Sequence, residues 1–343
     1  MAQVLNNKFD ILAVDINGMG YAAMYQPSLA NLKHKGFQTS GMHGGMTSLL
    51  SHMALRPGAV PFVLWDNRAE WRYELYPEYK GTRSSTEEKI AIKESYKRQT
   101  PYIFELLMAM GIPQVSCGGR EADDLCGQIV REIDPAWKME LVAKDTDWWQ
   151  GISESNVWFS TGTKVSIDLA ALTDPMTDRK EGHFVSTQEY LQAKALAGDA
   201  SDNIPGIEKV GILTAVKIMR KHGGTIHSYW DAVDSGSYKP KGVVENRMVE
   251  QASRDTYARN IKLMDWSLAP EADLAKMSLI AGKPDWALAQ AIADEFGMKK
   301  VLAHAREVLA PWEESGWGDA VTAVDAALHA PWTQPFVKRG VTC

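Results

Sequence analysis

Short apolar runs that end in aspartate recur in the first half of this chain and constrain its fold more than any other feature. Residues 9–15 read Phe-Asp-Ile-Leu-Ala-Val-Asp, residues 60–66 read Val-Pro-Phe-Val-Leu-Trp-Asp, and residues 139–143 lead to Asp145 and Asp147. Runs this short and apolar are typical of strands at the centre of a parallel sheet. We therefore expect an α/β fold with a mostly parallel central sheet flanked by helices.

The aspartates that end these runs predict one acidic site. In open α/β sheets, ligands bind at the edge formed by the carboxyl ends of the strands. A predicted helix near Glu121 carries Asp123 and Asp124 in its first turn and should begin at the same edge. Each acid alone has a plainer interpretation, as a turn former, a cap or a partner of the helix dipole. The combination at several strand ends is what favours a site.

Such a gathering of acids implies bound cations. Two unit charges about 4 Å apart at an effective dielectric near 20 repel by roughly 4 kcal/mol. The cluster therefore needs cations or strongly raised pKa values. Oxygen ligands of this kind suit Mg²⁺ or Mn²⁺ rather than zinc. A cluster this large would hold two ions, as phosphodiester-cleaving enzymes do.

The segment 67–100 differs from its surroundings, because cations, glutamates and aromatic residues alternate along it. An apolar helix from Tyr102 to Met110 follows it. From about residue 186 the chain reads as helical, with helices expected over 187–197 and 212–221. A loop rich in turn residues lies between them, and the part from 206 to 224 carries a formal charge of +3. We expect two domains, an α/β domain over 1–185 and a helical region over 186–343.

Composition excludes several classes of protein. Hydrophobic residues make up 45% of the 343, enough for globular cores. The chain has no apolar run of about 18 residues and its N-terminus lacks a secretory signal, so we expect no membrane span. Three cysteines without a Cys-x-x-Cys pair argue for a reducing compartment and against a zinc site. The formal net charge of −6 would become +3 without the nine acids assigned below, so it does not decide for or against nucleic acid.

Six segments in order along the chain resemble motifs of the 5′-nuclease (flap endonuclease) superfamily, in its phage and bacterial 5′→3′ exonuclease branch. They span about residues 10–225. They are Val14-Asp15-Ile-Asn-Gly, Leu64-Trp65-Asp66, Tyr79-Lys80-Gly81-Thr82-Arg83, Glu121-Ala-Asp123-Asp124, Lys144-Asp145-Thr-Asp147 and Gly198-Asp199-Ala-Ser-Asp202-Asn-Ile-Pro-Gly206. The resemblance implies a PIN/5′-nuclease-like fold with a helical arch, here residues 67–100, and a helix–hairpin–helix (H3TH-type) region, here residues 198–224.

The resemblance also implies a metal-binding set that is complete in this chain. Its members are Asp15, Asp66, Glu121, Asp123, Asp124, Asp145, Asp147, Asp199 and Asp202. The first four would form one metal site. Asp145, Asp147 and Asp199 would form a second, with Asp124 and Asp202 nearby or acting through water. This assignment requires Glu121 to lie just before regular helix, because helix geometry places Glu121 and Asp124, not Asp123, on one face.

Further residues would bind DNA if the resemblance holds. Lys80 and Arg83 would contact the scissile phosphate, where cations stabilise developing charge. Tyr21 would stack on a base. The glycine-bounded turn would bring backbone N–H groups close to a phosphate, and K⁺ is often bound there in the family. The expected DNA-binding residues are Tyr21, Arg72, Lys80, Arg83, Gly206, Lys209, Gly211 and Lys217.

The function implied is Mg²⁺-dependent cleavage near the 5′ end of duplex, nicked or flapped DNA, and of RNA primers paired with DNA, by two-metal-ion catalysis, with Asp145 and Asp147 among the catalytic residues. Mn²⁺ would substitute for Mg²⁺. We expect a monomeric, stand-alone enzyme of phage type, because 343 residues leave no room for a polymerase domain. It would act in DNA replication or degradation in the cytoplasm, which is the host cytoplasm for a phage protein.

Two alternatives stay open. A PIN-like ribonuclease shares an acidic α/β site, but it lacks the hairpin after the second metal motif, so residues 198–224 count against it. A structure-specific DNA-binding protein without catalysis would be favoured by the loss of several acids, and none is lost. Trp148 and Trp149 follow a strand directly, and we expect them in the core rather than at a base-stacking site.

Overall fold

A computed structural model describes residues 9–83, 86–162, 165–174 and 184–330 of the chain. The chain divides into two compact units. Unit 1 contains residues 1–69, 84–166 and 271–343, and unit 2 contains residues 70–83 and 167–270. Each unit is described separately below.

A seven-stranded sheet forms the centre of unit 1, with strand order β11-β5-β4-β1-β6-β7-β8. The strands are β1 (Ile11–Asp15), β4 (Val60–Leu64), β5 (Gln114–Cys117), β6 (Met139–Val142), β7 (Val157–Gly162), β8 (Val165–Ile167) and β11 (Met277–Ile280). β1 pairs in parallel with both β4 and β6, β4 with β5, and β6 with β7. The mostly parallel central sheet predicted from the sequence is confirmed.

The register of the central strands brings their acidic ends together. Asp15 at the end of β1 pairs with Leu64 of β4, and Val14 pairs with Val142 of β6. Nearly every residue of these three strands is buried, as their apolar sequences predict. Asp66 and Asp145 follow β4 and β6 within a few residues, so they start at the same edge as Asp15.

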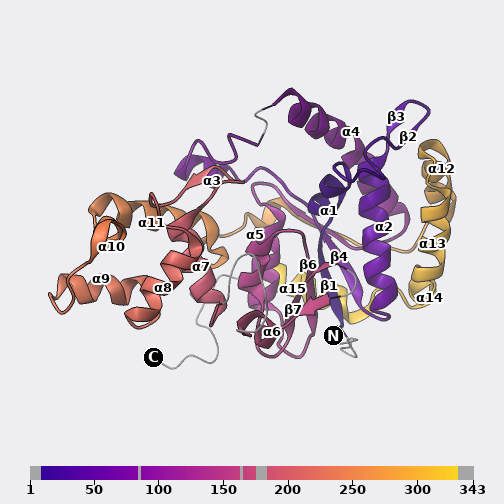
Figure 1. The fold of residues 1–343 in the computed structure, drawn as a ribbon. Coiled ribbons are helices and arrows are strands. Elements are labelled where there is room, and N and C mark those ends of the chain that lie inside the picture. The colour runs from indigo at the N-terminus through magenta and orange to yellow at the C-terminus, as the bar shows by residue number, and fades with distance from the viewer. Residues whose placement is uncertain (1–8, 84–85, 163–164, 175–183, 331–343) are drawn as a thin grey trace. The chain divides into compact units, whose positions relative to one another are not determined.

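Helices cover this sheet on both sides. In Figure 1, α5 lies on one side of β1, β4 and β6, and α1 and α2 lie on the other. The helices of unit 1 are α1 (Ile16–Ala23), α2 (Ser40–Leu55), α4 (Glu87–Ala109), α5 (Ala122–Glu132), α12 (Trp286–Phe296), α13 (Lys299–Leu309), α14 (Trp312–Ser315) and α15 (Gly318–His329), with a small β2–β3 hairpin (Lys33–His34 and Phe37–Gln38). Short 3₁₀ turns, η1 (Thr146–Gly151) and η3 (Leu274–Lys276), follow β6 and precede β11.

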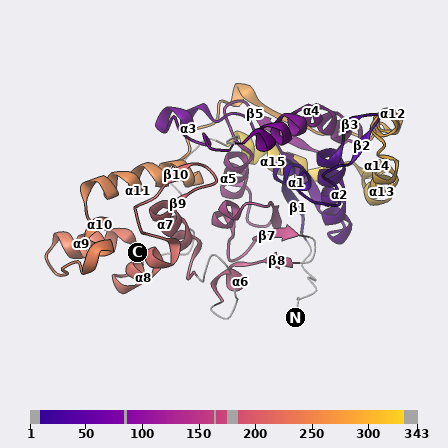
Figure 2. The same ribbon diagram turned by 45° about the horizontal axis from the view of Figure 1, so that its top comes forward.

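Unit 2 is built mainly from helices around a two-stranded hairpin, β9 (Gly198–Asp199) and β10 (Ile204–Pro205), which lies beside α7 and α11 (Figure 2). Its helices are α3 (Glu70–Leu75), α6 (Leu169–Thr173), α7 (Thr187–Ala197), α8 (Ile212–Lys221), α9 (Ile226–Asp234), α10 (Gly242–Met248) and α11 (Gln251–Met264), with the 3₁₀ turn η2 (Trp266–Leu268). The observed α7 and α8 have the bounds predicted from the sequence. Ser186 caps α7, because its side chain accepts a hydrogen bond from the Glu189 N–H.

Several segments differ from the sequence-based expectation. Residues 70–83, part of the expected arch, and residues 167–174 and 184–185 were expected in the α/β domain, yet they lie in unit 2. Residues 271 onward were expected in one helical region with 186–270, yet they lie in unit 1. The reason is that β11 adds an antiparallel edge strand to β5, and the following helices pack on unit 1, where Gln128 of α5 donates a hydrogen bond to the Leu328 carbonyl of α15. The predicted helix from Tyr102 begins earlier, at Glu87, and continues through Pro101.

A buried ion pair joins α2 to the central sheet. The Arg56 guanidinium lies 2.6 Å from the Glu140 carboxylate of β6, and both side chains are almost wholly enclosed. Burial raises the pKa of Glu140, while the bonds from Arg56 oppose that rise. Breaking such a pair leaves an uncompensated buried charge, which costs far more than loss of an exposed pair.

We predict that Arg56→Ala lowers the free energy of unfolding by about 3–5 kcal/mol at pH 7. The Glu140 pKa, already raised in the folded chain, rises further without Arg56, so the variant regains stability as pH falls toward 5. Denaturant unfolding at both pH values measures this. Glu295→Ala removes the exposed partner of Lys35 and serves as the control, with an expected loss below about 1 kcal/mol. Equal losses for the two variants at pH 7 would contradict the prediction.

Candidate functional site

Asp15 and Asp66 are held at the carboxyl edge of the sheet by hydrogen bonds from their own chain. Asp15 caps α1, where its Oδ1 accepts a hydrogen bond of 2.8 Å from the Gly18 N–H. Asp66 Oδ1 accepts one of 2.9 Å from the Ala122 N–H at the start of α5. Its Oδ2 accepts one of 3.3 Å from the Asn17 side-chain amide. Both carboxylates are therefore fixed by N–H groups at the starts of helices.

The start of α5 resolves the geometric question raised by the sequence. Glu121 lies just outside the helix as its N-cap residue, with extended backbone, as the resemblance requires. Asp124 accepts a hydrogen bond of 3.0 Å from the Glu121 N–H, and both side chains are buried. Asp124 is therefore committed to capping the helix. Asp123, between them, is only half-buried.

The carboxylates of these acids influence two buried side chains, Tyr96 and Cys126. Burial raises the pKa of the Tyr96 hydroxyl, and the carboxylates of Asp15 and Asp66 raise it further. Burial likewise raises the pKa of the Cys126 thiol, with additional contributions from Asp123 and Asp15. Coulomb effects weaken with distance. Tyr96 therefore lies near both Asp15 and Asp66, and Cys126 lies near both Asp15 and Asp123.

The end of β6 supplies the remaining acids of unit 1. Asp145 caps the 3₁₀ turn η1, and its Oδ1 accepts a hydrogen bond of 2.9 Å from the Asp147 N–H. Trp148 and Trp149 follow in the same turn and are buried, at 2% and 3% exposure. Their predicted place in the core is confirmed, and it anchors the turn that carries the two aspartates.

These carboxylates supply the oxygen donors that a hard divalent cation prefers. Within the described ranges, no group of three or more His, Cys, Asp or Glu side chains is arranged so that it could hold a metal ion. The carboxylates of Asp15, Asp66 and Asp145 each accept a hydrogen bond from a backbone N–H instead. The donor chemistry fits such a cation, and ligation would require side-chain rotation toward a common point.

In unit 2, Asp199 is paired with a buried lysine that the sequence analysis did not single out. Lys194 Nζ lies 2.9 Å from Asp199 Oδ2, and the side chains are 9% and 12% exposed. Burial alone would raise the pKa of Asp199. The Lys194 ammonium and the hydrogen bonds from Ser201 outweigh it and lower that pKa to about 2. The Asp199 carboxylate therefore stays ionised.

Asp202 holds the Tyr79–Arg83 segment within unit 2. Its carboxylate accepts a hydrogen bond of 3.1 Å from the Tyr79 hydroxyl and forms an ion pair with Arg83. Its backbone carbonyl accepts a hydrogen bond of 2.7 Å from the Lys80 N–H. Lys80 has a φ of 56°, a left-handed conformation that costs energy in a non-glycine residue. The two motifs therefore form one interlocked structure.

Glycines make the β9–β10 hairpin possible. Gly198 has a φ of +77°, and a Cβ on Gly206 would lie 2.1 Å from the Ala197 carbonyl. No side chain fits where these two backbones cross. The turn that follows ends at Gly211, the N-cap residue of α8, and Lys209 and Lys217 are exposed on either side of it. Exposed cations beside a helix start suit contact with a phosphate backbone.

Of the residues expected to contact DNA, Arg72 is buried and Tyr21 is half-buried. Arg72 is only 2% exposed and donates a hydrogen bond of 3.1 Å to the Leu263 carbonyl, with its guanidinium over the Trp71 ring. We therefore remove Arg72 from the expected DNA contacts, since it holds α3 to α11. Tyr21 is half-buried and contacts the edges of Tyr25 and Tyr96.

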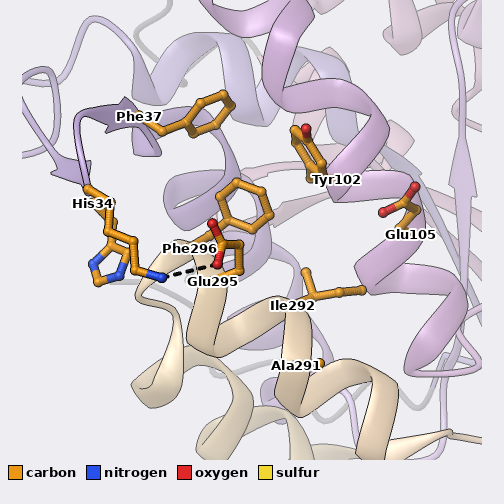
Figure 3. A pocket seen from close by; sticks show the side chains of 9 residues that line it. His34, Phe37, Tyr102, Glu105, Ala291, Ile292, Glu295 and Phe296 are labelled. Carbon is orange, nitrogen blue, oxygen red and sulfur yellow. Dashed lines mark hydrogen bonds and ion pairs between the residues drawn. The ribbon is translucent and has the colours of Figure 1, made fainter.

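A cavity of about 460 Å³ lies elsewhere in unit 1, between the β2–β3 hairpin, α4 and α12. Figure 3 shows the Phe37, Tyr102 and Phe296 rings that line it. Lys35, also in the lining, pairs with Glu295 at 3.0 Å. None of the predicted site residues lines this cavity. It is therefore separate from the acidic edge.

Residues 10–177 match the family described as 5′-3′ exonuclease, N-terminal resolvase-like domain. The DNA polymerase I of Streptococcus pneumoniae is 26% identical over 301 residues, covering 86% of this chain and 32% of that protein. The DNA polymerase I of Mycobacterium tuberculosis is 30% identical over 257 residues, covering 71% and 27%. The chain spans between about a quarter and a third of the length of these relatives.

Solved structures show the same fold. A flap endonuclease of bacteriophage T5, in a complex with DNA and metal ions, gives a TM-score of 0.61 at 22% identity and covers 88% of this chain and 98% of its own. Human GEN1 bound to Holliday junction DNA gives 0.56 at 14% identity, covering 90% and 72%. Likeness at these identities concerns the fold, and it confirms the predicted 5′-nuclease-like architecture. No helix in the described part of the chain is long and apolar enough to cross a membrane.

The hairpin geometry generates a stability prediction for Gly206→Ala. The added Cβ meets backbone atoms that cannot rotate away, so we expect a loss of about 2 kcal/mol or more in the free energy of unfolding. The matched control is Gly211→Ala, where a Cβ meets nothing within 4 Å, and where we expect a loss of about 1 kcal/mol or less from the poorer N-cap. Denaturant unfolding compares the two, and equal losses would show that the backbone crossing is not tight.

Proposed function

Because residues 10–177 belong to the 5′-3′ exonuclease N-terminal domain family, we propose that this chain is a divalent-metal-dependent nuclease. It would hydrolyse phosphodiester bonds near the 5′ end of duplex, nicked or flapped DNA. The observation that carries the proposal is the position of Asp15, Asp66 and the Glu121 helix start at one sheet edge within the matched residues. Acids at that edge of an α/β sheet are where a ligand is expected.

The proposed metal ligands in unit 1 are Asp15, Asp66, Glu121, Asp123, Asp145 and Asp147, with Asp124 as a capping neighbour. In unit 2 they are Asp199 and Asp202, on the strength of the resemblance. Mg²⁺, or Mn²⁺ in its place, suits this all-oxygen set. Bound divalent ions would neutralise phosphate charge and lower the pKa of the attacking water. The chain's own contribution is to orient the carboxylates through hydrogen bonds and, at Asp199, to favour the ionised form through the Lys194 ammonium.

Lys80 and Arg83 are proposed to stabilise the charge on the scissile phosphate. Arg83 is paired with Asp202 in unit 2. A phosphate bound by Arg83 would therefore compete with that carboxylate. Lys80 Nζ lies 4.9 Å from the centre of the Tyr79 ring, a cation–π contact that holds its position along the segment.

The duplex is proposed to bind at the hairpin of unit 2 through Gly206, Lys209, Gly211 and Lys217. K⁺ bound at the hairpin would add to this contact, and Tyr21 is proposed to stack on a base. The substrates would include RNA paired with DNA. The chain would act as a monomer in the cytoplasm. Its role would be the replication or degradation of DNA, as a stand-alone nuclease of phage type.

We predict that Asp145→Ala abolishes Mg²⁺-dependent cleavage of a flapped DNA while leaving its affinity for that DNA within a few-fold. The reason is that the aspartate would hold metal and not DNA. Gel-based cleavage and metal-free DNA binding measure the two properties. The control is Asp325→Ala, which removes an exposed aspartate of α15 that pairs with His329 and should change neither. Retained cleavage by Asp145→Ala would overturn the metal assignment.

Salt dependence tests the proposed duplex contact. Each lysine that neutralises a phosphate contributes about 0.9 to the slope of log affinity against log salt. Lys209→Gln combined with Lys217→Gln should therefore flatten that slope by nearly two units. Lys300→Gln on α13, an exposed lysine outside the proposed contact, should leave it unchanged. An unaltered slope in the double variant would place the duplex contact on other residues.

A further inference from the structure

A tyrosine of α4 is inserted between the first two helices of unit 1. Tyr96 is 7% exposed, and glycines leave room for its ring. A Cβ on Gly20 of α1 would lie 2.5 Å from the Tyr96 hydroxyl oxygen, and one on Gly41 of α2 would lie 2.6 Å from Cδ2 of the ring. The ring is therefore fixed by contact with two helix backbones.

The hydroxyl of this tyrosine lies at the start of α1, directly after Asp15. Its single proton lies between two acceptors, Asn17 Oδ1 at 3.3 Å and the Ile16 carbonyl at 3.5 Å, of which Asn17 is the nearer. The side-chain amide of Asn17 in turn donates to Asp66 Oδ2 at 3.3 Å. A chain of hydrogen bonds thus runs from α4 through Asn17 to a carboxylate of the candidate site.

Asp66 has its second oxygen fixed from another direction, by the Ala122 N–H of α5 at 2.9 Å. One carboxylate oxygen is therefore set by the main chain, and the other by a side chain whose own position depends on Tyr96. A carboxylate held at both oxygens has a defined plane. Rotation of the Asn17 amide would release only Oδ2, the oxygen that Asn17 holds.

We propose that Tyr96 is a positioning residue which, through Asn17, orients the Asp66 carboxylate for binding of a divalent cation. The inference rests on the proposed function and deepens it. It makes the cation affinity of the edge depend on how α4 is seated, although Tyr96 touches neither substrate nor metal. α4 begins at Glu87, within the charged segment expected to form the arch, so the same helix would serve both.

Packing alone does not require the hydroxyl. A phenylalanine ring would fill the same space, and a buried hydroxyl is unfavourable unless it is hydrogen-bonded. Gln99, also buried on α4, accepts a hydrogen bond of 3.0 Å from the Met42 N–H of α2 and donates to the Met24 sulfur and the Ser95 carbonyl, none of which belongs to the candidate site. Tyr96 differs because its partner is Asn17, one bond away from Asp66.

The test is Tyr96→Phe in the full chain, which removes the hydroxyl and keeps the ring. Titration calorimetry with Mn²⁺ on the DNA-free protein should give affinity weakened roughly 3- to 10-fold, the effect of one lost hydrogen bond. The Mg²⁺ concentration for half-maximal cleavage should rise by the same factor. The cleavage rate at saturating Mg²⁺ should stay within about 3-fold of the unaltered chain, because the loss is restored by mass action.

The matched control is Tyr102→Phe, a hydroxyl removed from the same helix at the cavity of Figure 3, which should leave the Mn²⁺ affinity unchanged. Asn17→Ala provides a second variant that does not depend on a buried ring. Tyr96→Phe and Asn17→Ala act in series, so their combined effect should be no larger than the greater single effect. Additive effects, or a Tyr96→Phe affinity equal to that of Tyr102→Phe, would overturn the inference.

Asp66→Ala separates this inference from the proposed function. If it binds Mn²⁺ and cleaves DNA like the unaltered chain, the proposed site itself is wrong. If it loses both while Tyr96→Phe and Asn17→Ala keep full affinity, the site stands and the positioning role of Tyr96 is rejected.

Discussion

Repulsion between carboxylates at one sheet edge is the constraint on which the rest of unit 1 depends. Parallel pairing of β1 with β4 and β6 places Asp15, Asp66 and Asp145 at neighbouring strand ends, and two such charges about 4 Å apart repel by roughly 4 kcal/mol. The chain offsets part of this with N–H groups aimed at the carboxylates, at the starts of α1, α5 and η1. One oxygen of each acid is therefore oriented by a main-chain donor, which replacement of a single side chain would not remove.

In unit 2, cationic side chains compensate the charge of the carboxylates. Lys194 lies against Asp199, and Arg83 against Asp202. A lysine or arginine partner compensates a carboxylate more strongly than an amide does, but it also competes with any cation that the carboxylate would bind. The interlocked motifs 79–83 and 198–206 therefore form a preassembled structure in which cations and anions are matched. Such matching gives the proposed phosphate-binding residues a defined place before substrate is bound.

The sequence predicted the regular parts of this fold because local patterns determine them. Apolar runs predicted β1, β4 and β6, turn residues and periodicity predicted the bounds of α7 and α8, and Trp148 and Trp149 were correctly expected in the core. Pairing between distant segments could not be predicted. The strand β11 was therefore missed, because it forms by pairing with β5, more than 150 residues earlier. The same reason applies to single side chains. Arg72 is buried where it bonds to the Leu263 carbonyl, and Tyr96 contacts the site through Asn17. Both contacts join residues far apart in the sequence, so the spacing of residues along the chain does not predict them.

The central claim is that the acidic edge supports metal-dependent cleavage near a 5′ end. The direct measurement is the size of the products released from 5′-labelled flapped, nicked and blunt duplexes, with and without Mg²⁺. The account predicts short 5′-labelled products, with cut sites set by the 5′ end or the flap junction, only when Mg²⁺ is present. Cleavage that persists in excess chelator, or products whose sizes bear no relation to the 5′ end or the junction, would contradict it.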